Sequence, residues 1–199
     1  MTNTNLAIET LTARLAPQAE ARPAQGAPPP VETWNPPFCG DIDMRISRDG
    51  SWRYLGSLIQ RPALVRLFST ILRKDPERYV LVTPVECVGI AVDDAPFVAV
   101  ELSVEGTGPQ RILRFRTNVE DWVAADADHP LRFESADAGG VKPYVLVRGG
   151  LWALVSRPVA IDLITLGEVR NCGEGDFFGV CSAGKFFPIS PAEDFDDLE

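Results

Sequence analysis

The chain has 199 residues, with 19 basic and 28 acidic side chains and a formal net charge of −9. This length allows a stable core without disulfides or metal ions. The negative balance argues against non-specific binding to nucleic acid or to a membrane surface, because both require a positive field. No stretch reaches the roughly 18 apolar residues of a membrane span, no secretory signal opens the sequence, and no cysteine pair has the two-residue spacing of a zinc or redox motif. We expect a cytoplasmic protein with reduced thiols and no cofactor.

Both ends of the sequence differ in composition from its middle. Residues 1–33 are rich in Pro and Ala and predict a flexible extension, with a short helix in which Leu6, Ile8, Leu11 and Leu15 share one side. Residues 192–199 predict an acidic, disordered tail. Between these ends we expect two folded units, an N-terminal α+β unit over 34–94 and a C-terminal unit over 95–191.

The first unit opens with a hairpin pattern. Ile42, Met44 and Ile46 alternate with polar residues, which predicts a half-buried strand. Asp49-Gly50 is a strong turn signal, and a return strand follows it. Arg61-Pro62 then begins an apolar pattern with helical spacing, which predicts a helix over 62–74. Two apolar strands are expected to flank the turn at 83–86.

The second unit shows a similar order. Strands are predicted at 144–148 and 151–155 around Gly149-Gly150, and Arg157-Pro158 begins a second helix that ends near Gly167. A hairpin follows over 177–181 and 185–189. Strands are also expected between the two copies, at 97–104, 112–117 and 131–135.

Gly50-Ser51-Trp52 thus matches Gly150-Leu151-Trp152, and Arg61-Pro62 matches Arg157-Pro158. This self-similarity predicts an internal duplication. The fold class is α+β, with mostly antiparallel sheet and two pseudo-repeated ββαββ-like units.

Several segments resemble a bacterial family catalogued as domain of unknown function 1285. They are the opening stretches 34–46 and 49–57, Thr83-Pro84-Val85-Glu86, Thr117-Asn118, residues 129–132 and Arg157-Pro158. The resemblance covers about residues 34–190. It implies a compact two-part fold with duplicated motifs and a C-terminal half similar to a pleckstrin-homology barrel. It also implies a nucleotide-like ligand between the halves and a role in signalling, without an established activity.

The two Arg-Pro pairs are the main candidate ligand-binding residues. Arg61 and Arg157 each lie at a predicted helix start, where unpaired N–H groups and a partial positive charge favour anions. A guanidinium beside those donors suits phosphate or carboxylate. The structural alternative is that each arginine pairs with a carboxylate such as Asp41 or Asp43.

Other candidates extend this site. Asp41 and Asp43 share one face of a strand and could orient the ligand, hold a cation or anchor Arg45. Trp52 is a candidate stacking platform, as are Tyr54 and Trp152, although core packing is the alternative for all three. The remaining candidates are Arg132 and Arg148 as further positive groups, Asn118 and Asp121 as caps of a helical turn, and Cys39 with His129 as a thiol–imidazole pair.

The leading hypothesis is a regulatory or signalling module that binds a small anionic, nucleotide-like ligand between its two units. An enzyme that uses Cys39 or the Asp41/Asp43 pair is the second hypothesis. A protein-interaction module that grips a protein partner is the third.

Overall fold

The computed structural model describes residues 13, 29–136, 140–173 and 175–194. The expected helix near the N-terminus and the last five residues of the acidic tail therefore lie outside the described residues. The chain forms two compact units, one that runs to Pro96 and includes Gly149–Leu151, and one made of Phe97–Arg148 and the chain from Trp152 onward. No helix among the described residues is long and apolar enough to cross a membrane.

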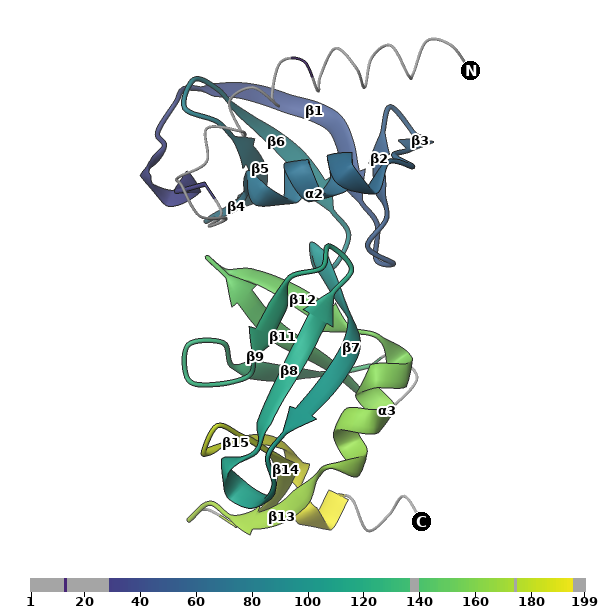
Figure 1. Ribbon diagram of the computed structural model, residues 1–199, viewed down its shortest axis with the longest axis vertical. Helices are drawn as coiled ribbons and strands as arrows, with labels where there is room; N and C mark the ends of the chain where they lie inside the picture. The colour runs from purple at the N-terminus through teal and green to yellow at the C-terminus, as the bar shows by residue number, and fades with distance from the viewer. Residues whose placement is uncertain (1–12, 14–28, 137–139, 174, 195–199) are drawn as a thin grey trace. The chain divides into compact units, whose positions relative to one another are not determined.

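From residue 29 onward, unit 1 forms a six-stranded sheet and the helix α2 (Figure 1). Its elements are η1 (Val31–Thr33), β1 (Phe38–Ile46), β2 (Trp52–Tyr54), β3 (Ser57–Leu58), α2 (Pro62–Thr70), β4 (Leu72–Asp75), β5 (Arg78–Val82) and β6 (Cys87–Val92). The strand order is β3-β2-β1-β6-β5-β4, and β1 runs parallel to β6 while the other neighbours are antiparallel. The expected hairpin at Asp49-Gly50 and the strands on both sides of residues 83–86 are confirmed.

Unit 2 contains a second six-stranded sheet, a helix and a three-stranded sheet. Its elements are β7 (Phe97–Glu105), η2 (Gly108–Gln110), β8 (Ile112–Thr117), β9 (Trp122–Ala124), β10 (Leu131–Ser135), β11 (Val141–Arg148), β12 (Leu151–Val155), α3 (Arg157–Thr165), β13 (Glu168–Asn171), β14 (Asp176–Ser182), β15 (Lys185–Pro191) and η3 (Ala192–Asp194). The larger sheet has the order β10-β11-β12-β7-β8-β9, and the smaller one β13-β14-β15.

The two six-stranded sheets share one topology. In each, two three-stranded meanders meet where the first strand lies parallel to the last, β1 to β6 and β7 to β12. The duplication is therefore present, but its boundaries differ from those that the sequence suggested. By strand order β11–β12 corresponds to β5–β6, not to β1–β2, so the two Arg-Pro helices begin at different points of the repeat. The predicted α+β class is present in coarse form, and each six-stranded sheet is mixed, with one parallel pair of strands at its centre.

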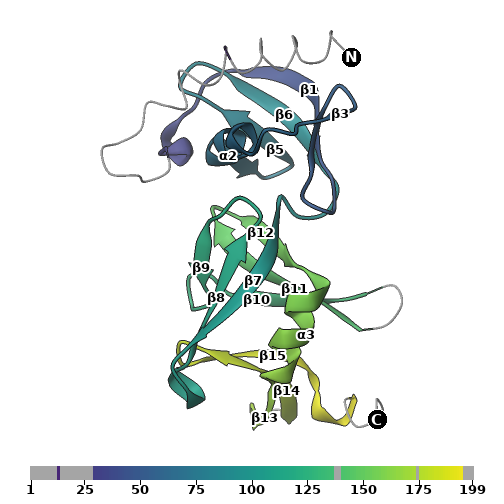
Figure 2. The same cartoon turned by 45° about the vertical axis from the view of Figure 1, so that its right-hand side comes forward.

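The helix α2 covers one face of the sheet in unit 1, which we call the helix face (Figure 2). Cross-strand pairs place Ile46 with Trp52 and with Val92 on this face. The Trp52 ring stacks on Phe68 of α2 with 6.2 Å between ring centroids. The predicted end of this helix is wrong, because α2 stops at Thr70 and Leu72 pairs with Leu81 in the sheet. Apolar spacing alone could not distinguish that last turn from the first residues of a strand.

The opposite face of this sheet, which we call the strap face, has a smaller core. Val80, Val82 and Cys87 are buried there beneath Val31 and the half-buried Trp34. We call residues 29–34 the strap. The Arg73 guanidinium donates to the carbonyls of Val31 (2.9 Å) and Trp34 (2.7 Å). The folded unit therefore begins before Trp34, because this end of the expected extension is pinned to the sheet.

In unit 2, one buried serine connects the small sheet to the large one. Ser182 on β14 is fully buried, donates to the carbonyl of Ala125 (2.6 Å) and accepts from the N–H of Leu113 on β8 (2.9 Å). The Arg111 guanidinium adds a bond to the carbonyl of Cys181 (3.0 Å). These bonds satisfy backbone groups that would otherwise be buried without partners.

Trp52 is expected to be essential for stability and Trp122 dispensable. The Trp52 side chain is 1% exposed, whereas Trp122 is 47% exposed. Trp52→Ala should cost about 3–5 kcal/mol through lost burial and a cavity, and the control Trp122→Ala should cost less than about 1 kcal/mol. Urea unfolding measures both values. Equal losses would contradict the assignment of Trp52 to the core.

Ser182→Ala should destabilise unit 2 by about 1–3 kcal/mol, because two buried backbone groups lose their partner. The control is Ser135→Ala, since Ser135 is exposed on the edge strand β10. Thermal unfolding of both variants tests this. A Tm for Ser182→Ala equal to that of the control would show that the serine does not hold the sheets together.

Candidate functional site

A helix begins at both Arg-Pro pairs, as predicted, and each helix has nine residues. Arg61 is the N-cap residue of α2 and has extended backbone, so Pro62 is the first helical residue. Arg157 is itself the first residue of α3, after the N-cap Ser156. Both arginines are exposed. Neither helix has a side-chain cap bond or an acidic residue in its first turn.

The carboxylates proposed to accompany Arg61 lie on the other side of the sheet. Asp41 pairs in register with Gly89, and Gly89 with Val80, so all three share the strap face. Asp43 has the same alternation and is exposed. Because α2 packs on the helix face, the sheet of unit 1 separates these carboxylates from the start of the helix.

Arg45 and Asp41 have local structural partners on the strap face. Arg45 pairs with Asp93, at the end of the neighbouring strand. The Asp41 carboxylate lies directly over Gly89, in the space that a Cβ would occupy. The absence of a side chain at residue 89 therefore allows the carboxylate to fold across β6.

Trp52 is unavailable as a stacking platform, because its ring is buried against Phe68. Its indole N–H is also buried, with no hydrogen-bond acceptor among the described residues. Trp52 therefore belongs to the core of unit 1 and offers no face to a ligand.

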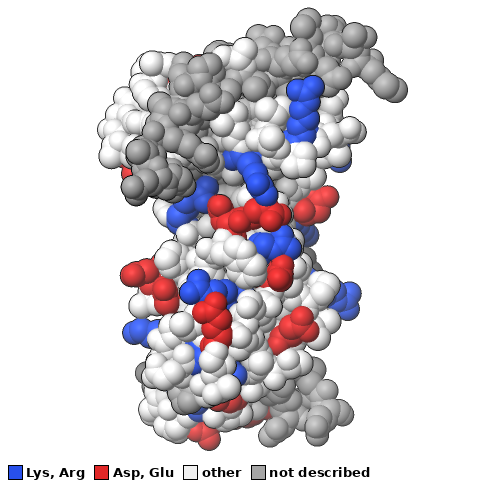
Figure 3. All heavy atoms as spheres, viewed as in Figure 1, with Lys and Arg blue, Asp and Glu red and all other residues white. Residues whose placement is uncertain are grey.

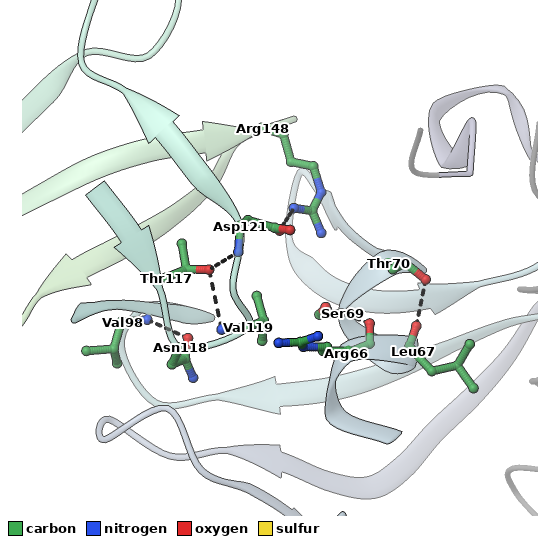
Figure 4. Close-up of polar contacts among 10 residues, drawn as sticks. All are labelled: Arg66, Leu67, Ser69, Thr70, Val98, Thr117, Asn118, Val119, Asp121 and Arg148. Atoms are coloured by element: carbon green, nitrogen blue, oxygen red, sulfur yellow. Dashed lines mark hydrogen bonds and ion pairs between the residues drawn. The ribbon is translucent and has the colours of Figure 1, made fainter. Parts of the chain in front are cut away.

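Arg132 and Arg148 are engaged within unit 2. The Arg132 guanidinium lies 4.7 Å from the Tyr144 ring centroid and 4.4 Å from that of Trp152, and it pairs with Glu134 at 3.1 Å. Arg148 pairs with Asp121 at 2.9 Å, and the two side chains point toward each other in Figure 4. Over the surface seen in Figure 3, basic and acidic side chains lie next to one another rather than in separate fields.

The segment after Thr117 forms a β-turn, so the predicted helical turn with Asn118 and Asp121 as caps is wrong. The buried Thr117 hydroxyl accepts from the N–H of Asp121 (3.1 Å), and the Asn118 side chain accepts from the N–H of Val98 (3.0 Å) (Figure 4). Glu120 has φ of +70°. These bonds fix the connection from β8 to β9, which explains a Thr-Asn signature without a ligand.

The proposed thiol–imidazole pair divides between the two units. Cys39 is exposed in unit 1, and its thiol donates to the carbonyl of Pro37 (3.4 Å). His129 lies in unit 2, where its ring bonds Asp126 at 3.1 Å. Burial opposes ionisation of Asp126, yet the backbone and ring hydrogen bonds from His129 hold the pKa of this carboxyl below its ordinary value. Among the described residues, no group of three His, Cys, Asp or Glu side chains is placed to hold a metal ion.

Sequence reasoning missed a polar cluster around Cys181. This thiol is 1% exposed and donates to the Glu168 carboxylate at 3.0 Å, and Glu168 also pairs with Arg170 at 2.7 Å. Burial, together with the hydrogen bond to Glu168, raises the pKa of Cys181 to about 11. The thiol is therefore protonated at neutral pH and serves as a hydrogen-bond donor rather than as a nucleophile. Only the pairing of β13 with β14 brings these residues together.

Glu168 should contribute stability that depends on pH. The hydrogen bond from Cys181 lowers the pKa of Glu168 below 4.5, with burial opposing and Arg170 assisting. The ionised carboxylate thus stabilises the fold above its ordinary pKa, and this contribution is lost as pH falls below the ordinary value and through the lower pKa of the folded state. Glu168→Gln should reduce stability at pH 7 and flatten its decline in that window, as urea midpoints would show. Glu134→Gln is the control, and an identical pH profile for both variants would contradict this role.

The comparisons with known proteins agree with this fold. The model of the Domain of unknown function (DUF1285), N-terminal domain, matches residues 29–95, and that of the Protein of unknown function (DUF1285), C-terminal domain, matches residues 96–189. The first match begins where the strap begins. No curated protein matches the chain.

Two solved structures are similar to this chain. A DUF1285 family protein from Silicibacter pomeroyi DSS-3 is 49% identical, covers 92% of this chain and 97% of its own, and superimposes with a TM-score of 0.82. A DUF1285 family protein from Shewanella baltica OS155 is 26% identical, covers 62% of this chain and 91% of its own, and has a TM-score of 0.51. With both family models spanning most of its length, the chain belongs to the DUF1285 family.

Proposed function

We propose that the protein is a regulatory module that binds a small anionic ligand, such as a nucleotide or another phosphorylated metabolite, through the helix starts at Arg61 and Arg157. The main observation behind this proposal is that the same local arrangement occurs at the start of both helices. Two helices begin with an exposed arginine beside a proline, and neither has a side-chain cap or an acidic residue in its first turn.

The chemistry of these helix starts favours an oxyanion. Backbone N–H groups of the first turn point away from the helix and carry partial positive charge. Proline removes one donor but fixes the backbone at the start of the helix. A guanidinium beside the remaining donors adds a full charge and a planar pair of N–H groups, which match two oxygens of a phosphate or carboxylate.

The residues assigned to the ligand are fewer than the sequence suggested. Trp52 is buried, and Asp41, Asp43 and Arg45 lie on the strap face, away from α2. The Arg132 guanidinium lies over the rings of Tyr144 and Trp152, and Arg148 is paired with Asp121. The proposal therefore rests on Arg61 and Arg157, which would bind the anionic group of the ligand. Other residues would have to recognise the rest of the ligand.

The cellular role belongs to the same proposal. In unit 2, a sheet in which β7 pairs with β8 and β8 with β9 in antiparallel fashion precedes the helix α3, and this arrangement supports the likeness to a pleckstrin-homology barrel. Because domains of that kind serve as binding modules rather than as catalysts, we place the protein in cytoplasmic signalling.

Isothermal titration calorimetry with ATP, GTP and inorganic phosphate tests the proposal. Arg61→Ala and Arg157→Ala should each weaken the best of these ligands by roughly 10- to 100-fold, because a charge-assisted hydrogen bond contributes about 1.5–3 kcal/mol. Arg53→Ala is the matched control, since Arg53 is exposed in unit 1 but lies on β2. Unchanged affinity in the Arg61→Ala, Arg157→Ala double variant would refute the proposal, as would the absence of binding to all three probes.

The stoichiometry of that titration decides whether the two arginines serve one ligand. One molecule bound per chain, lost on either substitution, indicates a shared site. Two molecules per chain, each lost on one substitution, indicate an independent anion site in each unit.

A further inference from the structure

The strap face of unit 1 has the features of a peptide-binding site with an occupant already in place. The strap residues 29–34 belong to no strand of the sheet. Instead, the Val31 side chain is buried in a cluster with Val80, Val82 and Cys87, and Trp34 packs against the same cluster. An apolar side chain in a pocket, with an aromatic residue three positions later, is a common way in which a short segment docks on a domain.

We propose that the surface formed by Val80, Val82 and Cys87 is a binding site for a short segment with the strap sequence, covered here by the chain's own strap and able to bind the same segment from a second copy. The strap sequence defines the class of ligand that this site would bind. It is an apolar residue and a tryptophan three positions apart on a tight turn that presents two carbonyls to one guanidinium.

The receptor side of the site is fixed independently of the strap. Arg73 donates to both carboxylate oxygens of Asp75, at 2.7 and 3.2 Å, so its side chain is oriented before any ligand arrives. Val80 and Val82 lie in β5, which is paired on both sides with β4 and β6. The main core of unit 1 lies on the helix face and does not include the strap.

The strap also holds its own conformation through hydrogen bonds between its residues. Its turn is closed by its own bonds, from the N–H of Thr33 to the carbonyl of Pro30 (3.0 Å) and from the N–H of Trp34 to that of Val31 (3.3 Å). Pro36-Pro37 separates the strap from β1 and keeps the intervening chain extended. The strap can therefore leave and re-bind as one unit, which is the arrangement that permits exchange between identical chains.

Cys87 reports on the opening of this site. It is 4% exposed beneath the strap, while Cys181 in unit 2 is 1% exposed and has no part in the site. Burial raises the pKa of both thiols, so both react slowly while covered. Cys181 thus reports on unfolding of unit 2. Strap opening and unfolding of unit 1 are distinguished by adding back the strap peptide, which cannot protect Cys87 in an unfolded unit.

The test is alkylation of the full-length chain with N-ethylmaleimide, followed for each cysteine by peptide mass spectrometry. A Cys39→Ser background removes the exposed thiol next to the paired residues Phe38 and Cys87. Val31→Asp should expel the strap and raise the rate at Cys87 by roughly tenfold or more, with the rate at Cys181 unchanged. Val31→Ala should give a smaller rise at Cys87 alone.

A synthetic peptide of residues 29–36 then tests exchange. In excess over the Val31→Asp protein it should slow labelling of Cys87 toward the original rate, whereas the same peptide with Val31→Asp should not. Protection should disappear in the Val31→Asp, Arg73→Met protein, because the guanidinium that holds the two carbonyls is gone. The proposal is overturned if Cys87 stays protected in both Val31 variants, if Cys87 and Cys181 open together in both, or if the wild-type peptide gives no protection.

Discussion

The parallel pairing between the first and last strands of each six-stranded sheet sets the positions of the other elements. Because β1 and β6 are parallel, the chain must cross from one edge of the sheet to the other before it can return. In unit 1 that crossing contains α2, which therefore lies over one face and buries Trp52 beneath Phe68. The same pairing places Asp41 beside Gly89, so the carboxylates of β1 lie on the face that the helix leaves uncovered.

The sequence predicted the elements better than their assembly. Alternation at Ile42, Met44 and Ile46 identifies a strand and shows which residues share a face, but alternation does not say which face a helix will cover. The sequence therefore allowed Arg61 and Asp41 to share one binding site, whereas in the structure the sheet of unit 1 separates Asp41 from the start of α2. The end of α2 was missed for a related reason, since Ile71 and Leu72 fit a helical period and a strand equally well. The pairing of Leu72 with Leu81 on the next strand, β5, decides between the two.

Other residues depended on partners far away in the sequence. Asn118 and Asp121 look like helix caps in isolation. In the structure, however, the N–H of Asp121 donates to the Thr117 hydroxyl within a β-turn, and the Asn118 side chain accepts from the backbone of β7. Cys181 showed no motif because its partner Glu168 reaches it only through the pairing of β13 with β14. Short patterns described the turns and helix starts well, while every contact between strands remote in sequence had to come from the structure.

The order in which the two units are completed along the chain follows from the position of Ser182. All six strands of the sheet in unit 1 have been synthesised once residue 92 is made. In unit 2, by contrast, the N–H of Leu113 and the carbonyl of Ala125 lack their hydrogen-bond partner until Ser182 is translated, more than fifty residues later. A nascent chain can thus fold its first unit on the ribosome while the second still lacks its final polar link, so a late truncation would spare one half of the protein and leave the other open to proteolysis.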